Sequence, residues 1–316
     1  MLISLAAVVV AFLASWILTP LVRVTARRRG LLDEPADRKI HDVAIPRLGG
    51  IAIAIALFVG VAVGLVVQSL QAGPPPPSHQ VLVILLGCAL VAIVGVLDDL
   101  VGMRARTKLA AQIAVALLVV LLGLSIKVVD GPWGTIELGA WSVPITALWF
   151  VVVMNAVNLI DGLDGLASGV ALTAMASLYL IGTAGEAQPQ IALILAAAAG
   201  GVLGFLPYNI FPATIIMGDT GAILLGFVLA AAGVSVTQSG MPGAAPWAPV
   251  AALGVALADT VWAIVRRGVS GAPIFAPDKR HIHHRLVAAG LSQRRAVLLL
   301  WLASAALGLT AVLTAR

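Results

Sequence analysis

Several polar segments interrupt an otherwise apolar chain, and their residue types are those that bind phosphate and divalent cations. The first is the adjacent pair Asp98-Asp99 in GVLDDLVGMRARTK. Two neighbouring carboxylates repel each other at a dry helix end, and a cation beside them offsets that cost. Mg²⁺ suits this position because it prefers oxygen ligands and often joins protein carboxylates to substrate phosphates. The alternative is a solvated helix end that pairs with Arg104, Arg106 or Lys108.

The second segment is NAVNLIDGLDGLASG, residues 155–169. Its amide and acid side chains recur at intervals of three, at Asn155, Asn158, Asp161 and Asp164. A helical turn would therefore stack them on one face, and Gly162 and Gly165 would let the backbone approach a ligand. An ordinary polar turn explains the composition, but it does not require four such groups in phase. We expect this segment to bind a polar ligand.

The third segment is MGDTGA, residues 217–222, which opens an apolar run. Asp219 between two glycines could cap a helix that starts there. Its position on the same side of the membrane as the first two segments, derived below, favours a catalytic role as well. Both interpretations stay open on the sequence alone.

The fourth segment lies in the connection 266–295, which contains APDKRHIHHRL. Asp278 could cap a short helix, on which His281, His284 and Arg285 would share a face at i, i+3 and i+4. This density of cationic and hydrogen-bonding groups fits a phosphate or diphosphate. A zinc site is less suitable because no Cys joins the cluster. An interfacial helix drawn to anionic lipids is the other alternative.

Two further positions carry weaker signals. Asp259, in a predicted span, could simply pair with Arg266 or Arg267. In the connection 23–47, Lys39 and His41 add cationic groups to the same side as the acidic segments, and we hold them as second-rank substrate-binding candidates.

The elements that must position these groups are membrane-spanning helices. The chain has 316 residues, of which 61% are hydrophobic and only 10% charged, against about 25% charge in soluble domains. Apolar runs long enough to cross a hydrocarbon core of about 30 Å recur along the chain. We predict an all-α polytopic membrane protein with one domain over residues 1–316 and spans at 2–22, 48–70, 81–97, 109–126, 143–160, 165–183, 190–207, 213–237, 245–265 and 296–315.

The basic residues predict how these ten spans are oriented. All Lys and Arg except Lys127 and Arg316 fall in the connections 23–47, 98–108 and 266–295, which the positive-inside rule assigns to the cytoplasm. Both termini are then outside, as is a short hairpin expected around Asp130-Gly131. Topology explains the basic residues, so nucleic-acid binding is a poor interpretation of the net charge of +5.

The acidic residues follow the same side. Apart from Asp130, Glu137 and Glu186, every carboxylate falls on or near the cytoplasmic face. A transporter more often carries such groups near the bilayer midplane and shows internal repeats, which we do not see. One-sided clustering instead favours an enzyme that meets soluble substrates at the membrane surface.

In these motifs the chain resembles the polyprenyl-phosphate N-acetylhexosamine-1-phosphate transferase family over nearly its whole length. The motifs are DEPADRKIHDVAIPRLGG, GVLDDLVGMRARTKLAAQ, NAVNLIDGLDGLASG, MGDTGA and ADTVWAIVRRGVSGAPIFAPDKRHIHHRL. The HIHHRL ending is similar to the bacterial branch that uses UDP-N-acetylglucosamine (UDP-GlcNAc). The pentapeptide transferase branch of peptidoglycan synthesis, which stays an alternative, typically has three consecutive histidines there.

The resemblance implies transfer of GlcNAc-1-phosphate from UDP-GlcNAc to undecaprenyl or another polyprenyl phosphate, with release of UMP. It implies a bacterial inner-membrane enzyme with a cytoplasmic active site and Mg²⁺, or Mn²⁺, as cofactor; a homodimer is compatible with it. By motif, Asp98 and Asp99 match the acidic pair around the metal and the lipid phosphate, and Asp219 matches a metal ligand. We expect Asp219 and Asp99 to hold the Mg²⁺. Residues matched to nucleotide-sugar and diphosphate contacts are Asn158, Asp161, Asp164, His281, His283 and His284.

Two positions depart from the family pattern. Ile216 stands where relatives often have an aromatic residue that can stack on uracil, and Ala222 stands where a Ser is common. Neither change removes a charged group, so we expect activity. We expect a single displacement in which Asp98 orients the lipid phosphate or accepts its proton; a double displacement through an aspartyl-phosphate is the competing route.

Overall fold

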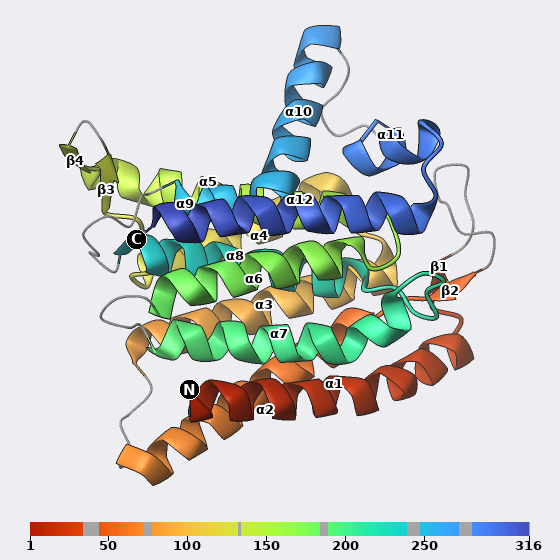
Figure 1. Ribbon diagram of the computed structural model, residues 1–316, viewed down its shortest axis with the longest axis horizontal. Helices are drawn as coiled ribbons and strands as arrows, with labels where there is room; N and C mark the ends of the chain where they lie inside the picture. The colour runs from red at the N-terminus through yellow and green to blue at the C-terminus, as the bar shows by residue number, and fades with distance from the viewer. Residues whose placement is uncertain are drawn as a thin grey trace.

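The computed structural model describes residues 1–33, 44–72, 78–131, 134–183, 189–238, 247–271 and 280–315. It is a bundle of long helices that run side by side (Figure 1). These are α1 (Leu2–Arg28), α2 (Gly49–Ala72), α3 (His79–Val101), α4 (Ala105–Leu121), α5 (Ser142–Ile160), α6 (Leu166–Thr183), α7 (Pro189–Asn209), α8 (Gly218–Gln238), α10 (Gly254–Ser270) and α12 (Gln293–Thr314). Short elements are β1 (Leu32–Asp33), β2 (Ile45–Pro46), β3 (Val128–Gly131), β4 (Gly134–Glu137), η1 (Gly139–Trp141), α9 (Ala248–Ala252) and α11 (Ile282–Ala288).

The predicted all-α membrane architecture is confirmed. Within the described ranges, eight helices are long and apolar enough to cross a membrane. A lipid-exposed backbone must satisfy its own hydrogen bonds, which is why such apolar runs form helices. The helix α4 corresponds to another predicted span but has only 17 residues, and its first turns carry Arg106 and Lys108.

The ninth predicted span, 245–265, is not one helix. The short α9 ends at Ala252, its C-cap residue Leu253 has a ψ of 8° that departs from helical geometry, and α10 begins at Gly254. From there α10 leaves the bundle and stands across the direction of the other helices (Figure 1). Hydropathy averages over such a break, so composition alone predicted a continuous span. The new direction is important because α10 carries Asp259.

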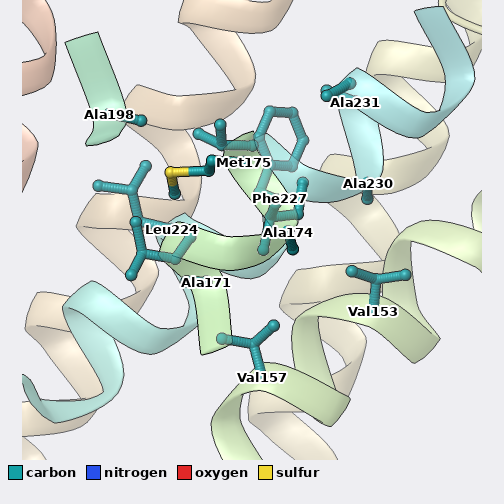
Figure 2. Close-up of a cluster of buried hydrophobic side chains, with 14 of the residues drawn as sticks. Val153, Val157, Ala171, Ala174, Met175, Ala198, Leu224, Phe227, Ala230 and Ala231 are labelled. Carbon is teal, nitrogen blue, oxygen red and sulfur yellow. The ribbon is translucent and has the colours of Figure 1, made fainter. Parts of the chain in front are cut away.

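The centre of the bundle is α8, which is buried along nearly its whole length. Small residues let neighbouring helices approach it closely, as is typical of helices packed in lipid. Figure 2 shows this core, where Leu224, Phe227, Ala230 and Ala231 of α8 meet side chains of α5, α6 and α7. Because α8 contacts helices on all sides, its amino-terminal end is fixed in place relative to the rest of the bundle.

The two ends of the bundle differ. Both termini and the β3–β4 hairpin lie at one end, and β1, β2 and α11 lie at the other (Figure 1). The hairpin pairs Asp130 with Thr135 in antiparallel register, as the sequence predicted. The β1–β2 pair, which joins Leu32 to Pro46, was not predicted. It brings the first connection against the end of the bundle where the acidic motifs also lie.

Close helix packing generates a stability prediction at Gly226 in α8. A Cβ added there would lie 2.6 Å from Met154 Cα in α5, which is backbone and cannot swing away. We expect Gly226→Ala to lower stability by about 1–3 kcal/mol through overpacking, measured by thermal unfolding in detergent. In the control Gly268→Ala, the added Cβ meets nothing within 4 Å. Equal unfolding temperatures for the two variants would contradict this packing.

Candidate active site

The carboxylate of Asp99 caps the central helix. Its Oδ1 accepts a hydrogen bond from the Asp219 backbone N–H at 2.9 Å, and its Oδ2 accepts from the Thr220 N–H at 3.0 Å and the Thr220 hydroxyl at 2.6 Å. These amides belong to the first turn of α8 and lack partners within the helix. Gly218 permits the approach, since a Cβ there would lie 2.7 Å from Asp99 Oδ2. Asp99 therefore holds α8 to the end of α3.

The Lys108 ammonium bridges the carboxylates of Asp98 and Asp219. Its Nζ lies 2.9 Å from Asp98 Oδ2 and also contacts Asp219 Oδ1. The second oxygen of Asp98 accepts from the Met103 N–H at 2.7 Å. The pairing alternative is thus confirmed for Lys108, but this helix end is buried, with Asp98 only 6% exposed. Asp219 turns its side chain to Lys108, and the residue that caps α8 is Asp99.

Asp161 lies in the connection between α5 and α6, close enough for the charges of Asp219 and Asp99 to affect its ionisation. Burial, followed by the charges of Asp219, Asp99, Asp164 and Asp33, raises the pKa of Asp161 to about 7. Like charges disfavour ionisation, so the neighbouring carboxylates add to the effect of burial. The predicted meeting of the three acidic motifs is therefore observed.

These residues fit a divalent cation by the chemistry of their donors. Among the described residues, no three acidic, His or Cys side chains already form a metal-binding group. Mg²⁺ commonly uses only one or two carboxylates and completes its shell with water and substrate phosphate. Asp219, with a side chain 33% exposed, and Asp161 are the groups best placed to hold it. Asp99, also predicted as a metal ligand, has both oxygens engaged by α8.

The histidine segment forms α11 and packs on the Asp161 connection. A Cβ added at Gly162 would lie 2.2 Å from His283 Nε2, so the imidazole sits directly on this glycine. The His283 ring stacks on that of His281 at 5.9 Å and lies 4.3 Å from that of His284. Burial, with a contribution from His284, lowers the pKa of His283 to about 3. His283 is therefore neutral at physiological pH.

The predicted face of this helix is wrong in part. His281 is the N-cap residue of α11 and is buried together with His283, whereas Arg285 is exposed. The i, i+3 and i+4 spacing predicted a helix that already includes His281, whereas α11 begins at Ile282. The predicted cap, Asp278, lies outside the described residues. Its role is taken by Asp259, whose Oδ1 accepts from the Ile282 N–H at 2.8 Å, so the predicted pairing of Asp259 with Arg266 or Arg267 missed this contact.

The polar groups of residues 155–169 do not all face one ligand. Asn155 donates to Gln112 Oε1 of α4 at 2.7 Å, and Asp164 Oδ2 accepts from the Ala213 N–H at 2.9 Å. The helix α5 ends at Ile160, so its three-residue phase does not continue to the acids. Asn158 is partly exposed.

The first connection is fastened to the site through its backbone. The Ile216 N–H donates to Pro46 O at 3.0 Å, and the Gly49 N–H donates to Ile216 O at 3.1 Å. The backbone of Ile216 therefore holds this connection beside Asp219, and this role does not depend on the Ile216 side chain. Lys39 and His41 lie outside the described residues, so their predicted roles stay predictions.

Sequence reasoning assigned no site role to Lys108, or to Arg47 and Asp33. Arg47 pairs with Asp33 at 3.3 Å and donates to the Asp99 carbonyl at 3.4 Å. The sequence held a usable signal for Lys108, because Gly102 follows the apolar run and Lys108 comes soon after it. In the structure Gly102 has a φ of +66°, and a short turn separates α3 from α4. Such a turn returns the first helical residues of α4 to the acidic end of α3.

The amino-acid sequence is similar to those of known transferases. Residues 81–237 match the sequence model of glycosyl transferase family 4. The chain is 38% identical to a probable undecaprenyl-phosphate N-acetylglucosaminyl 1-phosphate transferase of Bacillus subtilis, over 93% of this chain and 81% of that protein. It is 36% identical to a decaprenyl-phosphate N-acetylglucosaminephosphotransferase of Mycobacterium leprae (95% and 80%). It is 29% identical to a phospho-N-acetylmuramoyl-pentapeptide-transferase of Desulfitobacterium hafniense (97% and 95%).

The raised pKa of Asp161 predicts a pH-dependent cost to stability. The folded chain holds this proton more tightly than the unfolded chain, whose Asp keeps its ordinary pKa of 3.8. Stability is therefore lost as the pH rises from about 4 to about 7. Asp161→Asn should raise the unfolding temperature at about pH 8 but not at about pH 4, in EDTA. The control is Glu137→Gln in the exposed strand β4; a pH-independent effect of Asp161→Asn would contradict the account.

Lys108 supplies a second prediction. Lys108→Met removes the cation between Asp98 and Asp219, and loss of one partner from a buried ion pair costs about 3–5 kcal/mol. Thermal unfolding should show a large loss, partly restored when Asp98→Asn is added because one uncompensated charge disappears. The neighbouring exposed Arg106 provides the control Arg106→Met. Similar losses for both single variants would show that Lys108 is not a buried bridge.

Proposed function

The chain belongs to glycosyl transferase family 4, and on that premise we propose that it transfers GlcNAc-1-phosphate from UDP-GlcNAc to undecaprenyl phosphate and releases UMP. Relatives named for this activity on undecaprenyl or decaprenyl phosphate share 36–38% of their residues with the chain over most of its length. The relative named as a pentapeptide transferase is 29% identical, so that alternative is weaker. A secondary transporter has no support from these similarities.

One observation carries the proposal: acidic groups from three distant segments meet beside a lysine and a histidine helix at one end of a membrane bundle. Asp98, Asp161 and Asp219 converge there, with α11 packed on Gly162. Phosphoryl transfer requires mainly the positioning of phosphates and the offset of their charge. A site at the bundle end can take a soluble nucleotide from water and a lipid headgroup from the membrane.

The residues divide this work in the following way. Asp98 orients the incoming lipid phosphate through Lys108, which is bound to Asp98 and offers that phosphate a cationic partner. A lipid phosphate oxygen attacks the β-phosphorus of UDP-GlcNAc, the β-phosphorus–oxygen bond to the α-phosphate breaks, and the negative charge leaves on UMP. His281 and His284 donate hydrogen bonds to the diphosphate. Asp164 and Asn158 contact the nucleotide-sugar.

A divalent cation, Mg²⁺ or Mn²⁺, is part of the proposal. When bound, it stabilises the charge that develops on the diphosphate. Asp219 and Asp161 would hold it, which explains why the site carries more carboxylates than Lys108 offsets. Asp99 contributes by fixing the first turn of α8 and, with it, Asp219.

We further propose that this end of the bundle faces the cytoplasm of a bacterial inner membrane. Among the described basic residues, Arg47 and Lys108 lie at this end, and the positive-inside rule favours that orientation. UDP-sugars would then reach the site from the cytosol. Homodimerisation and the roles of Lys39 and His41 stay predictions.

The activity is tested directly with purified protein. We expect UMP release when UDP-GlcNAc, undecaprenyl phosphate and Mg²⁺ are all present, and none with UDP-N-acetylmuramoyl-pentapeptide. Asp98→Asn should lower turnover by about 10²–10³-fold, because it removes a charge that acts on the reacting phosphate, with little loss of nucleotide-sugar binding. Release with the pentapeptide donor alone would favour the alternative, and collapse of donor binding in Asp98→Asn would reject its assigned role.

Cation binding has its own readout. Millimolar Mg²⁺ should raise the unfolding temperature, because a ligand that binds only the folded state stabilises it. This shift should vanish in Asp219→Asn and persist in Glu137→Gln. An equal shift in all three proteins would place the cation elsewhere.

A further inference from the structure

Asp259 forms a buried pair with His281 that the proposed chemistry does not yet use. The two residues come from different elements, α10 and the start of α11, and each is only 5% exposed. Asp259 Oδ2 lies 2.7 Å from His281 Nδ1. We infer that Asp259 is a positioning residue that fixes the orientation and the tautomer of His281 toward the diphosphate, an inference that rests on the proposed function.

The two carboxylate oxygens of Asp259 have different partners, and this decides which ring nitrogen of His281 carries the proton. Asp259 Oδ1 accepts from the Ile282 N–H at 2.8 Å, so Oδ2 remains for His281. An ionised carboxylate can only accept hydrogen bonds, and the proton of a neutral His281 must therefore sit on Nδ1. The opposite ring nitrogen, Nε2, then carries a lone pair, so it donates to the diphosphate only when the ring is protonated on both nitrogens. A carboxylate behind a histidine also stabilises the imidazolium form.

The same contacts fix where the imidazole lies. Its ring is parallel to that of His283, with an interplanar angle of 5°, and His283 rests on Gly162 beside Asp161. His281 is thus held between Asp259 on α10 and the acidic connection after α5. The break before α10 allows α10 to leave the bundle on the side of α11 (Figure 1), and Asp259 of α10 contacts the first residues of α11.

Asp259→Asn is the informative change because it preserves shape. The asparagine oxygen can keep the Ile282 N–H, but the amide NH₂ then faces His281 Nδ1 as a donor. The ring must turn Nδ1 into an acceptor and move its proton to Nε2. We expect kcat to fall about 10–100-fold, by analogy with the cost of removing the carboxylate partner of a metal-bound histidine, with the KM for UDP-GlcNAc changed less than about threefold.

Two comparisons separate positioning from a purely structural role. If Asp259 acts through His281, the double variant Asp259→Asn with His281→Gln should be no slower than His281→Gln alone. Asp259→Glu, which keeps the charge, should retain more activity than Asp259→Asn. The matched control is Thr260→Val: Thr260 is buried next to Asp259, and its hydroxyl bonds only within α10, to Ala256 O. This variant should keep wild-type kcat.

The tautomer itself is measured by ¹⁵N NMR of histidine-labelled full-length protein in nanodiscs. The chain has only five histidines, so the spectrum contains few signals. The signals lost in His281→Gln belong to His281. At about pH 8, where an ordinary imidazole is neutral, the Nδ1–H form should dominate in the wild type and the Nε2–H form in Asp259→Asn. The same tautomer in both proteins, an unchanged kcat, or losses that multiply in the double variant would each overturn the inference. Absence of UMP release by the wild type would reject the proposed function instead, and the NMR comparison would still decide whether Asp259 sets the tautomer.

Discussion

Carboxylates at the end of an apolar bundle are costly unless something offsets their charge, and the way this is achieved organises the site. The amides of the first turn of α8 bind Asp99, and Lys108 binds Asp98 and Asp219. Burial, followed by the charges of the neighbouring carboxylates, raises the pKa of Asp161 to about 7. The site is therefore preorganised for cationic and phosphate-bearing ligands by the same contacts that hold α3, α4 and α8 together.

This arrangement also explains how segments far apart in the sequence act together. The central position of α8 fixes Asp219, and the backbone bonds of Ile216 tie the first connection to the same point. The histidine helix is added from another direction, through Asp259 of α10 and the contact of His283 with Gly162. Each contact restricts a group that would otherwise move on a surface loop, and electrostatic catalysis depends on such restriction.

Much of the fold could be predicted from sequence because apolar length and basic connections obey strong physical rules. The membrane bundle, the β3–β4 hairpin and the meeting of Asp98, Asp161 and Asp219 followed from those rules. Contacts set by local geometry did not follow. Hydropathy could not show the break at Leu253, a three-residue spacing could not show that α5 ends before Asp161, and no pattern paired Asp259 with His281. The two roles within the Asp98-Asp99 pair differ only because one carboxylate meets the amides of α8 and the other meets Lys108.

The central claim is that these acidic groups enclose one divalent cation together with the diphosphate of the donor. Anomalous diffraction from crystals grown with Mn²⁺ and UDP-GlcNAc would locate the ion without assumptions about its ligands. The account predicts one strong peak beside the carboxylates of Asp219 and Asp161, with phosphate oxygens completing its coordination. A peak among the histidines of α11 or at the opposite end of the bundle, or bound nucleotide with no ion near Asp219, would contradict it.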